Sequence, residues 1–211
     1  MLMNRVETAL INSPPRRALQ RYYEVPALQR LGGSLPHDAR VLELGCGAGY
    51  GTELILAQFA AARVDAVDLD PAMVARARRR LAGYQGRVRL MVGDATDLRA
   101  ALDAEDASYD AVFDFAIIHH VPDWRAALSE VARVLKPGGR FYFDEVTAAA
   151  LATRAYRWLF DHPTEERFSG EEFLTELQHQ GLRVDPRSRT HLRGHYLLGV
   201  AERPHSGQEA R

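Results

Sequence analysis

An α/β fold with a doubly wound, mostly parallel sheet is the architecture that this sequence predicts, and three observations lead to it. Short apolar runs alternate with segments of helical periodicity from residue 40 to residue 145, which is typical of strands covered by helices on both faces. A glycine-rich turn joins the first apolar run to the first helical segment. A chain of 211 residues with 46% hydrophobic residues favours one domain with a sizeable core.

Five apolar runs are expected to form parallel strands, because each is short and bounded by turn residues. They are Arg40–Leu44, Arg63–Asp68, Arg87–Val92, Ala111–Ile117 and Arg140–Glu145.

Helices are expected near Tyr50–Ala60, Pro71–Leu81 and Asp123–Leu135. The last of these carries apolar residues at helical spacing, which indicates core packing rather than a site. Lys136–Gly139 is expected to end it, because proline cannot continue a helix and glycine accepts a left-handed exit.

The two ends of the chain depart from this alternation. A helix around Ser169–Gln180 is followed by two extended segments, Leu182–Arg189 and His195–Ala201. Strands so close in sequence must be antiparallel, since a parallel return needs a crossover of a dozen or more residues. Pro15–Leu31 predicts an amphipathic helix ahead of the sheet, and Pro204–Arg211 is expected to be a disordered tail.

The turn between the first strand and the first helix is the most informative segment. Gly45, Gly47, Gly49 and Gly51 stand at alternate positions. Glycine adopts positive φ and, without a Cβ atom, lets a ligand approach the main chain and the N–H groups at a helix start. The dinucleotide fingerprint would require glycine where Tyr50 stands. The turn therefore predicts a binding site for a nucleotide-like cofactor other than NAD.

An acidic residue ends the second strand, where a cofactor's ribose would be held. Asp68 lies 23 residues after Gly45, and a carboxylate there can accept hydrogen bonds from both ribose hydroxyls. The alternative is a carboxylate with no role beyond the strand end. Asp70 is expected to cap the helix that Pro71 opens.

A second acid follows the third strand. The Asp94 carboxylate can accept from the exocyclic amine of adenine, while the N–H of Ala95 donates to a ring nitrogen. The alternative role for Asp94 is capping of the short helix that contains Leu98, for which Asp97 is the other candidate.

With these motifs in place, the segment from about Arg40 to Glu145 resembles the class I S-adenosylmethionine-dependent methyltransferases. The resemblance implies a Rossmann-like seven-stranded sheet of order 3-2-1-4-5-7-6 with strand 7 antiparallel. It implies an N-terminal helical lid over residues 1–35, a catalytic domain over 36–203 and a tail over 204–211. It also implies S-adenosyl-L-methionine as cofactor and S-adenosyl-L-homocysteine as product.

The same resemblance implies a set of cofactor-binding residues around the glycine turn and the strand ends. They are Glu43, Gly45, Cys46, Gly47, Gly49, Asp68, Leu69, Asp94, Ala95 and Phe115. Glu43 is expected to hold the cofactor's α-amino group, because a carboxylate inside a strand is costly without a cation or hydrogen bonds.

Two histidines just past the fourth strand are the candidate catalytic residues. His119 and His120 could supply a base, since imidazole titrates near neutrality. The alternative is that one of them only orders this loop or faces the sulfonium. No metal site is expected, because no third ligand has recognisable spacing.

The expected acceptor is a small organic molecule that is methylated at oxygen, nitrogen or carbon. Its pocket is expected to be lined by the N-terminal helix, the loop His119–Trp124 and the segment Thr147–Arg167, which carries Tyr156, Trp158 and Phe160. Tyr22 and Tyr23 could close over the cofactor or pack on the sheet, and packing is favoured.

The composition of the chain limits which partners and which cellular location are expected. The net charge of −1 gives no support to a nucleic-acid partner, and no apolar run is long enough for a transmembrane segment. The single cysteine fits a reducing cytoplasm. We expect a cytoplasmic monomer or homodimer. Two alternatives stay open: a lipid head-group methyltransferase that uses the basic N-terminal helix at a membrane surface, and a non-catalytic S-adenosylmethionine-binding subunit.

Overall fold

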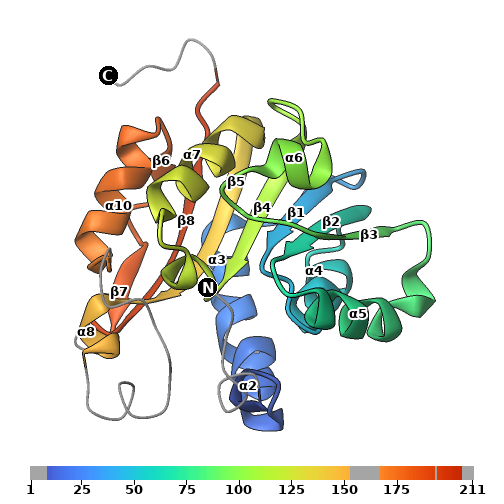
Figure 1. Cartoon of the computed structure of the whole chain (residues 1–211). Helices are drawn as coiled ribbons and strands as arrows, with labels where there is room; N and C mark the ends of the chain where they lie inside the picture. Colours follow the sequence, from blue (N-terminus) through green and yellow to red (C-terminus); the bar gives the residue numbers. More distant parts are fainter. Residues whose placement is uncertain (1–8, 153–166, 193, 206–211) are drawn as a thin grey trace.

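The computed structural model describes residues 9–152, 167–192 and 194–205. One sheet runs through the molecule, with helices on both faces (Figure 1). Its strand order is β3-β2-β1-β4-β5-β8-β6, and a further short strand, β7, pairs with β8. The predicted fold class is confirmed.

The first five strands are parallel to one another, as predicted. They are β1 (Arg40–Leu44), β2 (Arg63–Asp68), β3 (Val88–Val92), β4 (Tyr109–Phe115) and β5 (Leu135–Val146). β1 and β2 have the predicted bounds, whereas β4 begins and ends two residues earlier than expected.

The helix ends within one residue of the prediction, but Lys136–Gly139 does not form the expected glycine exit. The helix ends at Val134, Leu135 is already extended, and β5 begins there. Gly138 does adopt a positive φ of 78°, but it lies within the irregular start of β5, where the pairing with β4 shifts register between Tyr109 and Ala111. The glycine therefore accommodates a bulge in a strand and does not cap a helix.

The predicted helices of the central and C-terminal parts lie close to their expected positions. They are α4 (Tyr50–Gln58), α5 (Pro71–Arg80), α6 (Leu98–Leu102), α7 (Trp124–Val134) and α10 (Gly170–His179). Three short helices were not predicted: η2 (Ala82–Tyr84), η3 (Ile118–His120) and α8 (Ala148–Leu151). Asp70 caps α5 by accepting a hydrogen bond from Ala72 N at 2.7 Å, as predicted. α6, α7 and α10 pack on one face of the sheet, and α3, α4 and α5 pack on the other.

The C-terminal hairpin differs from the prediction in one respect. The expected strand Leu182–Arg189 is divided into β6 (Arg183–Val184) and β7 (Arg189–His191), both antiparallel to β8 (Tyr196–Glu202). Between them Asp185 forms a turn, accepting from Arg187 N and from Ser188 N at 2.8 Å each. Pro186 has no N–H to donate to a ladder, so the strand breaks there. The sheet therefore has eight strands in the described residues, with β8 in the place predicted for strand 7.

The N-terminal helix is less regular than expected. It consists of α2 (Pro14–Leu19), a π-helical turn η1 (Gln20–Glu24) and α3 (Val25–Gly32). α3 is fixed to the sheet, since the Arg140 guanidinium donates to Gly32 O at 2.6 Å. The expected packing of Tyr22 and Tyr23 on the sheet is wrong, because these side chains are 75% and 48% exposed.

A buried carboxylate ties four strands together near their amino ends. Asp65 on β2 accepts hydrogen bonds from the Tyr109 hydroxyl at 2.7 Å, Arg40 Nη2 at 2.7 Å and Arg89 Nε at 3.1 Å. These partners lie on β4, β1 and β3. The cluster is at the opposite end of the sheet from the glycine turn.

Some expectations concern residues that the structure does not describe, and one concerns membrane-spanning helices. Tyr156, Trp158 and Phe160 lie outside them, as does all of the predicted tail beyond His205. Within the described ranges, no helix combines the length and apolar content that crossing a membrane requires.

Candidate functional site

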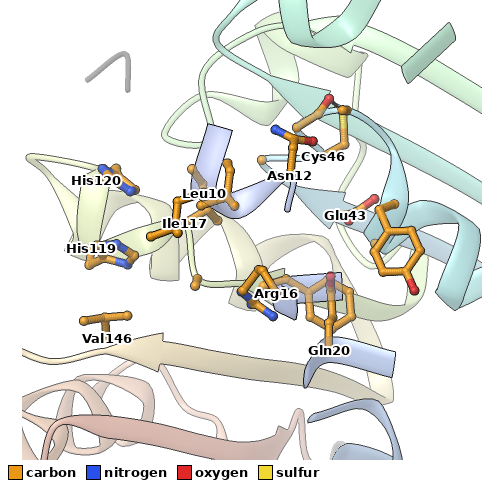
Figure 2. Close-up of a pocket in the computed structure, with 18 residues that line it drawn as sticks. Leu10, Asn12, Arg16, Gln20, Glu43, Cys46, Ile117, His119, His120 and Val146 are labelled. Carbon is orange, nitrogen blue, oxygen red and sulfur yellow. Dashed lines mark hydrogen bonds between the residues drawn. The ribbon is translucent and has the colours of Figure 1, made fainter. Parts of the chain in front are cut away.

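Two adjoining cavities lie at the carboxyl ends of the central strands. The larger has a volume of about 190 Å³ and the smaller about 70 Å³. Gly45, Ile117 and His120 border both. Figure 2 shows the larger cavity with His119 and His120 on one side, Glu43 and Cys46 on the other, and Arg16 and Ile117 between them in this view.

The glycine turn shapes the boundary between these cavities. Gly45, Gly47 and Gly49 all have positive φ, at 61°, 52° and 84°. A Cβ atom on Gly49 would lie 3.1 Å from Ala77 Cα in α5, whereas one on Gly47 would meet nothing within 4 Å. Gly49 is therefore needed for packing and borders neither cavity. Gly47 faces open space, which is where a ligand can approach the backbone.

Gly51 was not among the predicted site residues, yet its lack of a side chain matters. A Cβ atom there would overlap the Glu43 carboxylate. The fourth glycine of the alternating pattern thus makes room for the acid two residues ahead of the turn.

Glu43 is 2% exposed and borders the larger cavity. The Thr52 hydroxyl donates a hydrogen bond to its carboxyl group. Burial raises the pKa of Glu43 to about 8. A ligand that brings a positively charged amino group would stabilise the ionised form of this carboxyl, so the site fits the α-amino group of the expected cofactor.

Asp68 closes the turn from the side of β2. Its Oδ2 atom accepts from Gly47 N at 2.7 Å, and its Oδ1 atom accepts from Asp70 N at 2.8 Å. Burial raises the pKa of Asp68, and these two backbone hydrogen bonds oppose that shift. The carboxylate borders the smaller cavity, at the place expected for a ribose.

Asp94 borders the same cavity, together with Leu69 and Ala95. Its Oδ1 atom accepts from Thr96 N and from the Thr96 hydroxyl, both at 2.9 Å. The alternative role for Asp94, capping of α6, is wrong, because Asp97 provides that cap by accepting from Ala100 N at 2.9 Å. The smaller cavity thus collects the acids predicted for ribose and adenine.

Cys46 and Phe115, also predicted as cofactor-binding residues, border the larger cavity. Cys46 is 4% exposed, and burial raises the pKa of its thiol. A thiol of this kind remains protonated and unreactive, so Cys46 serves as a small residue in a tight turn.

The two histidines differ in their surroundings. His119 Nδ1 lies 2.6 Å from Glu145 Oε2, and burial lowers the pKa of His119 to about 3, so its imidazole is uncharged near neutrality. His120 is 4% exposed and its ring centroid lies 4.2 Å from that of His119. Both histidines border the larger cavity, and Glu145 is the carboxylate partner of His119.

Glu145, at the end of β5, was not found from the sequence. Its Oε1 atom accepts from Ile118 N at 2.6 Å and His119 N at 3.3 Å, and its Oε2 atom accepts from Val146 N at 3.0 Å. This side chain therefore fixes the η3 turn and the orientation of the His119 ring together. The sheet order places the ends of β4 and β5 side by side. The predicted sheet order was therefore the signal that could have identified Glu145 as a partner of the histidine loop.

Two pairs of buried carboxyl groups surround this part of the site, and none of their side chains is exposed. Burial together with the Glu145 charge raises the pKa of Asp114 well above its usual range. Burial and the charge of Glu24, in η1, raise the pKa of Asp144 well above its usual range as well.

The N-terminal segment covers the larger cavity. Leu10, Ile11, Asn12, Arg16 and Gln20 line it. Arg16 Nη1 lies 2.7 Å from Glu24 Oε2 and its Nη2 lies 3.9 Å from Asp144 Oδ1.

Gln20 is 7% exposed and lines the cavity (Figure 2). Its side-chain amide makes no hydrogen bond to another of the described residues. Neither Arg16 nor Gln20 was among the predicted site residues, and no local motif marks them.

Several known proteins with similar sequences and structures are methyltransferases. Residues 41–139 match the family described as "Methyltransferase domain". The malonyl-[acyl-carrier protein] O-methyltransferase of Halorhodospira halophila is 34% identical over 170 residues, which cover 80% of this chain and 56% of that protein. The ubiquinone biosynthesis O-methyltransferase of Xanthomonas oryzae pv. oryzae is 38% identical over 118 residues, covering 54% of this chain and 46% of that protein.

Among solved structures, an S-adenosylmethionine-dependent methyltransferase from Mesorhizobium loti has the same fold. It superposes with a TM-score of 0.66 at 22% identity, over 84% of this chain and 96% of that chain. The chain spans about half the length of the first curated relatives that it matches.

Proposed function

Because the chain belongs to the class I S-adenosylmethionine-dependent methyltransferases, we propose that it transfers a methyl group from S-adenosyl-L-methionine to a small organic molecule. The acceptor atom is oxygen, nitrogen or carbon, and S-adenosyl-L-homocysteine is the product. One observation carries the proposal: two adjoining cavities meet at Gly45, with the buried acid Glu43 on one and Asp68 on the other.

The proposed cofactor contacts follow the two cavities. In the smaller cavity Asp68 accepts from the ribose hydroxyls, Asp94 and the N–H of Ala95 bind adenine, and Leu69 adds an apolar contact.

In the larger cavity Glu43 binds the α-amino group. The backbone from Gly45 to Gly47, with Phe115 beside it, lies against the methionine end. Gly49 has an indirect role, because it lets the turn pack on α5.

When bound, S-adenosyl-L-methionine supplies an activated methyl group that carries its own leaving group. The protein's task is then to hold the acceptor in line with that methyl and to exclude water. The apolar side chains of Leu10 and Ile11 line the N-terminal side of the cavity and suit both purposes. They support the proposal that the N-terminal helices act as a lid, as predicted for residues 1–35.

Of the two candidate catalytic residues, we assign the role of proton acceptor to His119. Its partner Glu145 holds the ring in place and can stabilise an imidazolium. His120 borders both cavities, which suits a contact with the part of the cofactor that joins them. A cytoplasmic location, a monomeric or homodimeric state and the lack of a nucleic-acid partner stay predictions.

Calorimetric titration tests the proposal. S-adenosyl-L-homocysteine should bind, and NADH should not. Asp68→Ala should abolish the heat of binding, whereas Asp70→Asn, which retains a helix cap, should not. Binding of NADH in place of S-adenosyl-L-homocysteine would overturn the proposal. Binding without methyl transfer to any acceptor would favour the non-catalytic subunit.

A further inference from the structure

We propose that Arg16, Glu24 and Asp144 form a latch that holds α2 over the larger cavity, and that α2 bends away at η1 to let ligands enter and leave. The three side chains are positioning residues, because they act through α2 and not on the reacting atoms. This inference rests on the function proposed above for what occupies the cavity. It adds the residues that control access to it.

α3 is fixed to the rest of the domain. Val25 and Leu28 are fully buried in the core on this face of the sheet. At the end of the helix, the Arg140 guanidinium donates to Gly32 O at 2.6 Å. Apolar packing and a hydrogen bond to β5 therefore keep α3 in place whatever α2 does.

α2 has no comparable packing. None of its six residues is buried. Its contacts with the rest of the domain include the latch and a hydrogen bond of 3.4 Å from the Tyr50 hydroxyl to Arg17 O, and both are polar. A segment with few buried apolar contacts opens at a lower free energy than the core, so α2 can leave the domain while the sheet stays folded.

The hinge between α2 and α3 is the π-helical turn η1. Val25 N–H donates to Gln20 O there, five residues back. Pro26 follows, and because proline has no N–H, the helical hydrogen bond that its position would make is missing. π-Helical turns are frequent at functional sites. The weakened hydrogen-bond ladder makes this turn the place where the N-terminal helices bend.

The latch joins α2 to the hinge and to the sheet. Arg16 Nη1 lies 2.7 Å from Glu24 Oε2 in η1, and its Nη2 lies 3.9 Å from Asp144 Oδ1 near the end of β5. The two carboxyl side chains are at most 1% exposed, whereas Arg16 is 22% exposed. Outward movement of α2 would take the guanidinium away from both carboxyl groups. Separation of a buried ion pair is unfavourable, so the latch favours the closed position.

α2 and the hinge cover only one half of the site. Arg16 and Gln20 line the larger cavity together with Glu43 (Figure 2), and neither of them lines the smaller one. A ligand that extends to Glu43 therefore lies beneath the latch. A ligand confined to the smaller cavity does not.

Binding kinetics with two probes test the latch. S-adenosyl-L-homocysteine extends into both cavities, whereas 5′-methylthioadenosine lacks the amino-acid part. In Arg16→Met the association and dissociation rate constants of S-adenosyl-L-homocysteine should both rise about tenfold, the effect of losing a hydrogen bond between charged groups, because opening precedes both steps. The rate constants of 5′-methylthioadenosine should not change. Arg16→Lys keeps the charge and should restore part of the parent behaviour.

Two further variants separate the latch from a general loss of stability. Arg16→Met leaves buried carboxyl groups without their cation, which is destabilising. Arg16→Met combined with Glu24→Gln removes both charges of the closer pair and should fold, yet it should retain the faster kinetics. The matched control is Asp65→Asn, which alters a buried carboxylate at the opposite end of the sheet and should leave both rate constants unchanged.

Hydrogen exchange of the ligand-free protein tests the movement itself. Amides of α2 should exchange about tenfold faster in Arg16→Met than in the parent protein, while those of α3 and of β1 to β5 should exchange as before. This measurement involves no ligand, so it does not respond to a direct contact between Arg16 and the cofactor.

The outcomes distinguish this inference from the proposed function. Failure of the parent protein to bind S-adenosyl-L-homocysteine would overturn the proposed function, and hydrogen exchange would still test the latch. Unchanged exchange of α2 in Arg16→Met and in the double variant would overturn the latch alone. Faster dissociation without faster association would identify Arg16 as a ligand contact and would also overturn it, as would an equal effect on 5′-methylthioadenosine.

Discussion

Replacement of Glu43 by glutamine is expected to stabilise the ligand-free protein and to weaken cofactor binding. Burial raises the pKa of Glu43 from 4.5 to about 8. Between these values the folded protein keeps a proton that the unfolded chain has released, so the free energy of unfolding falls as the pH rises, by about 1.4 kcal/mol per unit. From pH 4.5 to pH 7.5 the loss is at most about 4 kcal/mol. Glutamine does not titrate, so the Glu43→Gln variant avoids this loss of stability.

The ligand requires the opposite charge state. At pH 7 a carboxyl group with a pKa of about 8 is mostly protonated, whereas a bound ammonium group needs the carboxylate. Binding of S-adenosyl-L-homocysteine should therefore release close to one proton. The Glu43→Gln variant should release none, and its affinity should be about 10- to 150-fold lower, which corresponds to the 1.5–3 kcal/mol of a hydrogen bond to a charged group.

Two measurements check this pair of effects. Urea unfolding at pH 5 and pH 7.5 gives the stability, and calorimetry at pH 7 in buffers of different ionisation enthalpy gives the proton count. Glu53→Gln, in the first turn of α4 and ion-paired with Arg80, is the matched control and should alter neither. The reasoning is refuted if Glu43→Gln has the same pH dependence of stability as the parent protein, or if it still releases a proton on binding.

Three further predictions concern the turn and the sheet. Asp68→Asn should lower the affinity for S-adenosyl-L-homocysteine at least tenfold, since the charged acceptor of Gly47 N–H is lost; calorimetry showing unchanged affinity would contradict this. Gly47→Ala and Gly49→Ala should each cost about 1 kcal/mol of stability, because both positions have positive φ. Thermal unfolding should show a further loss of stability only for Gly49→Ala, whose new Cβ atom would contact α5. Gly47→Ala should fold but should not bind S-adenosyl-L-homocysteine. Asp65→Asn should destabilise by about 1–3 kcal/mol and leave cofactor affinity intact, so a parallel loss of binding would argue against its purely structural role. Burial acts to raise the pKa of Asp65, but hydrogen bonds from Tyr109 and Arg40 lower it overall, so its stabilisation is present at neutral pH and disappears as the pH falls through the folded-state pKa.

The sheet could be predicted where one segment of sequence determines one element. β1 and β2 are uninterrupted apolar runs ended by polar residues, and their bounds were correct. The errors occurred where tertiary contacts outweigh local preference. Proline and glycine after Val134 suggested a helix exit, but pairing with β4 extends β5 through them. Nothing local to Gln20–Glu24 indicates that its turn is π-helical.

The candidate site divides in the same way. The glycine turn, Asp68 and Asp94 were predicted because each lies in a short motif whose chemistry is visible in the sequence. Glu145, Glu24 and Gln20 were not, because each acts through a partner from a distant part of the chain: Glu145 through His119, Glu24 through Asp144, and Gln20 through the cavity it lines. The acceptor side of the site depends on such pairs, and so it could not be inferred from spacing.

The side chains over the larger cavity come from residues 10 to 20, which precede the segment shared with the methyltransferase family, residues 41–139. Under the proposed function, residues 41–139 hold the donor, and the leading helices contribute side chains to the acceptor side of the cavity. The leading helices can change in evolution without disturbing the glycine turn, so relatives that retain this turn are free to diverge in what they methylate. Grafting the leading helices between such relatives is the corresponding route to altered selectivity in the laboratory.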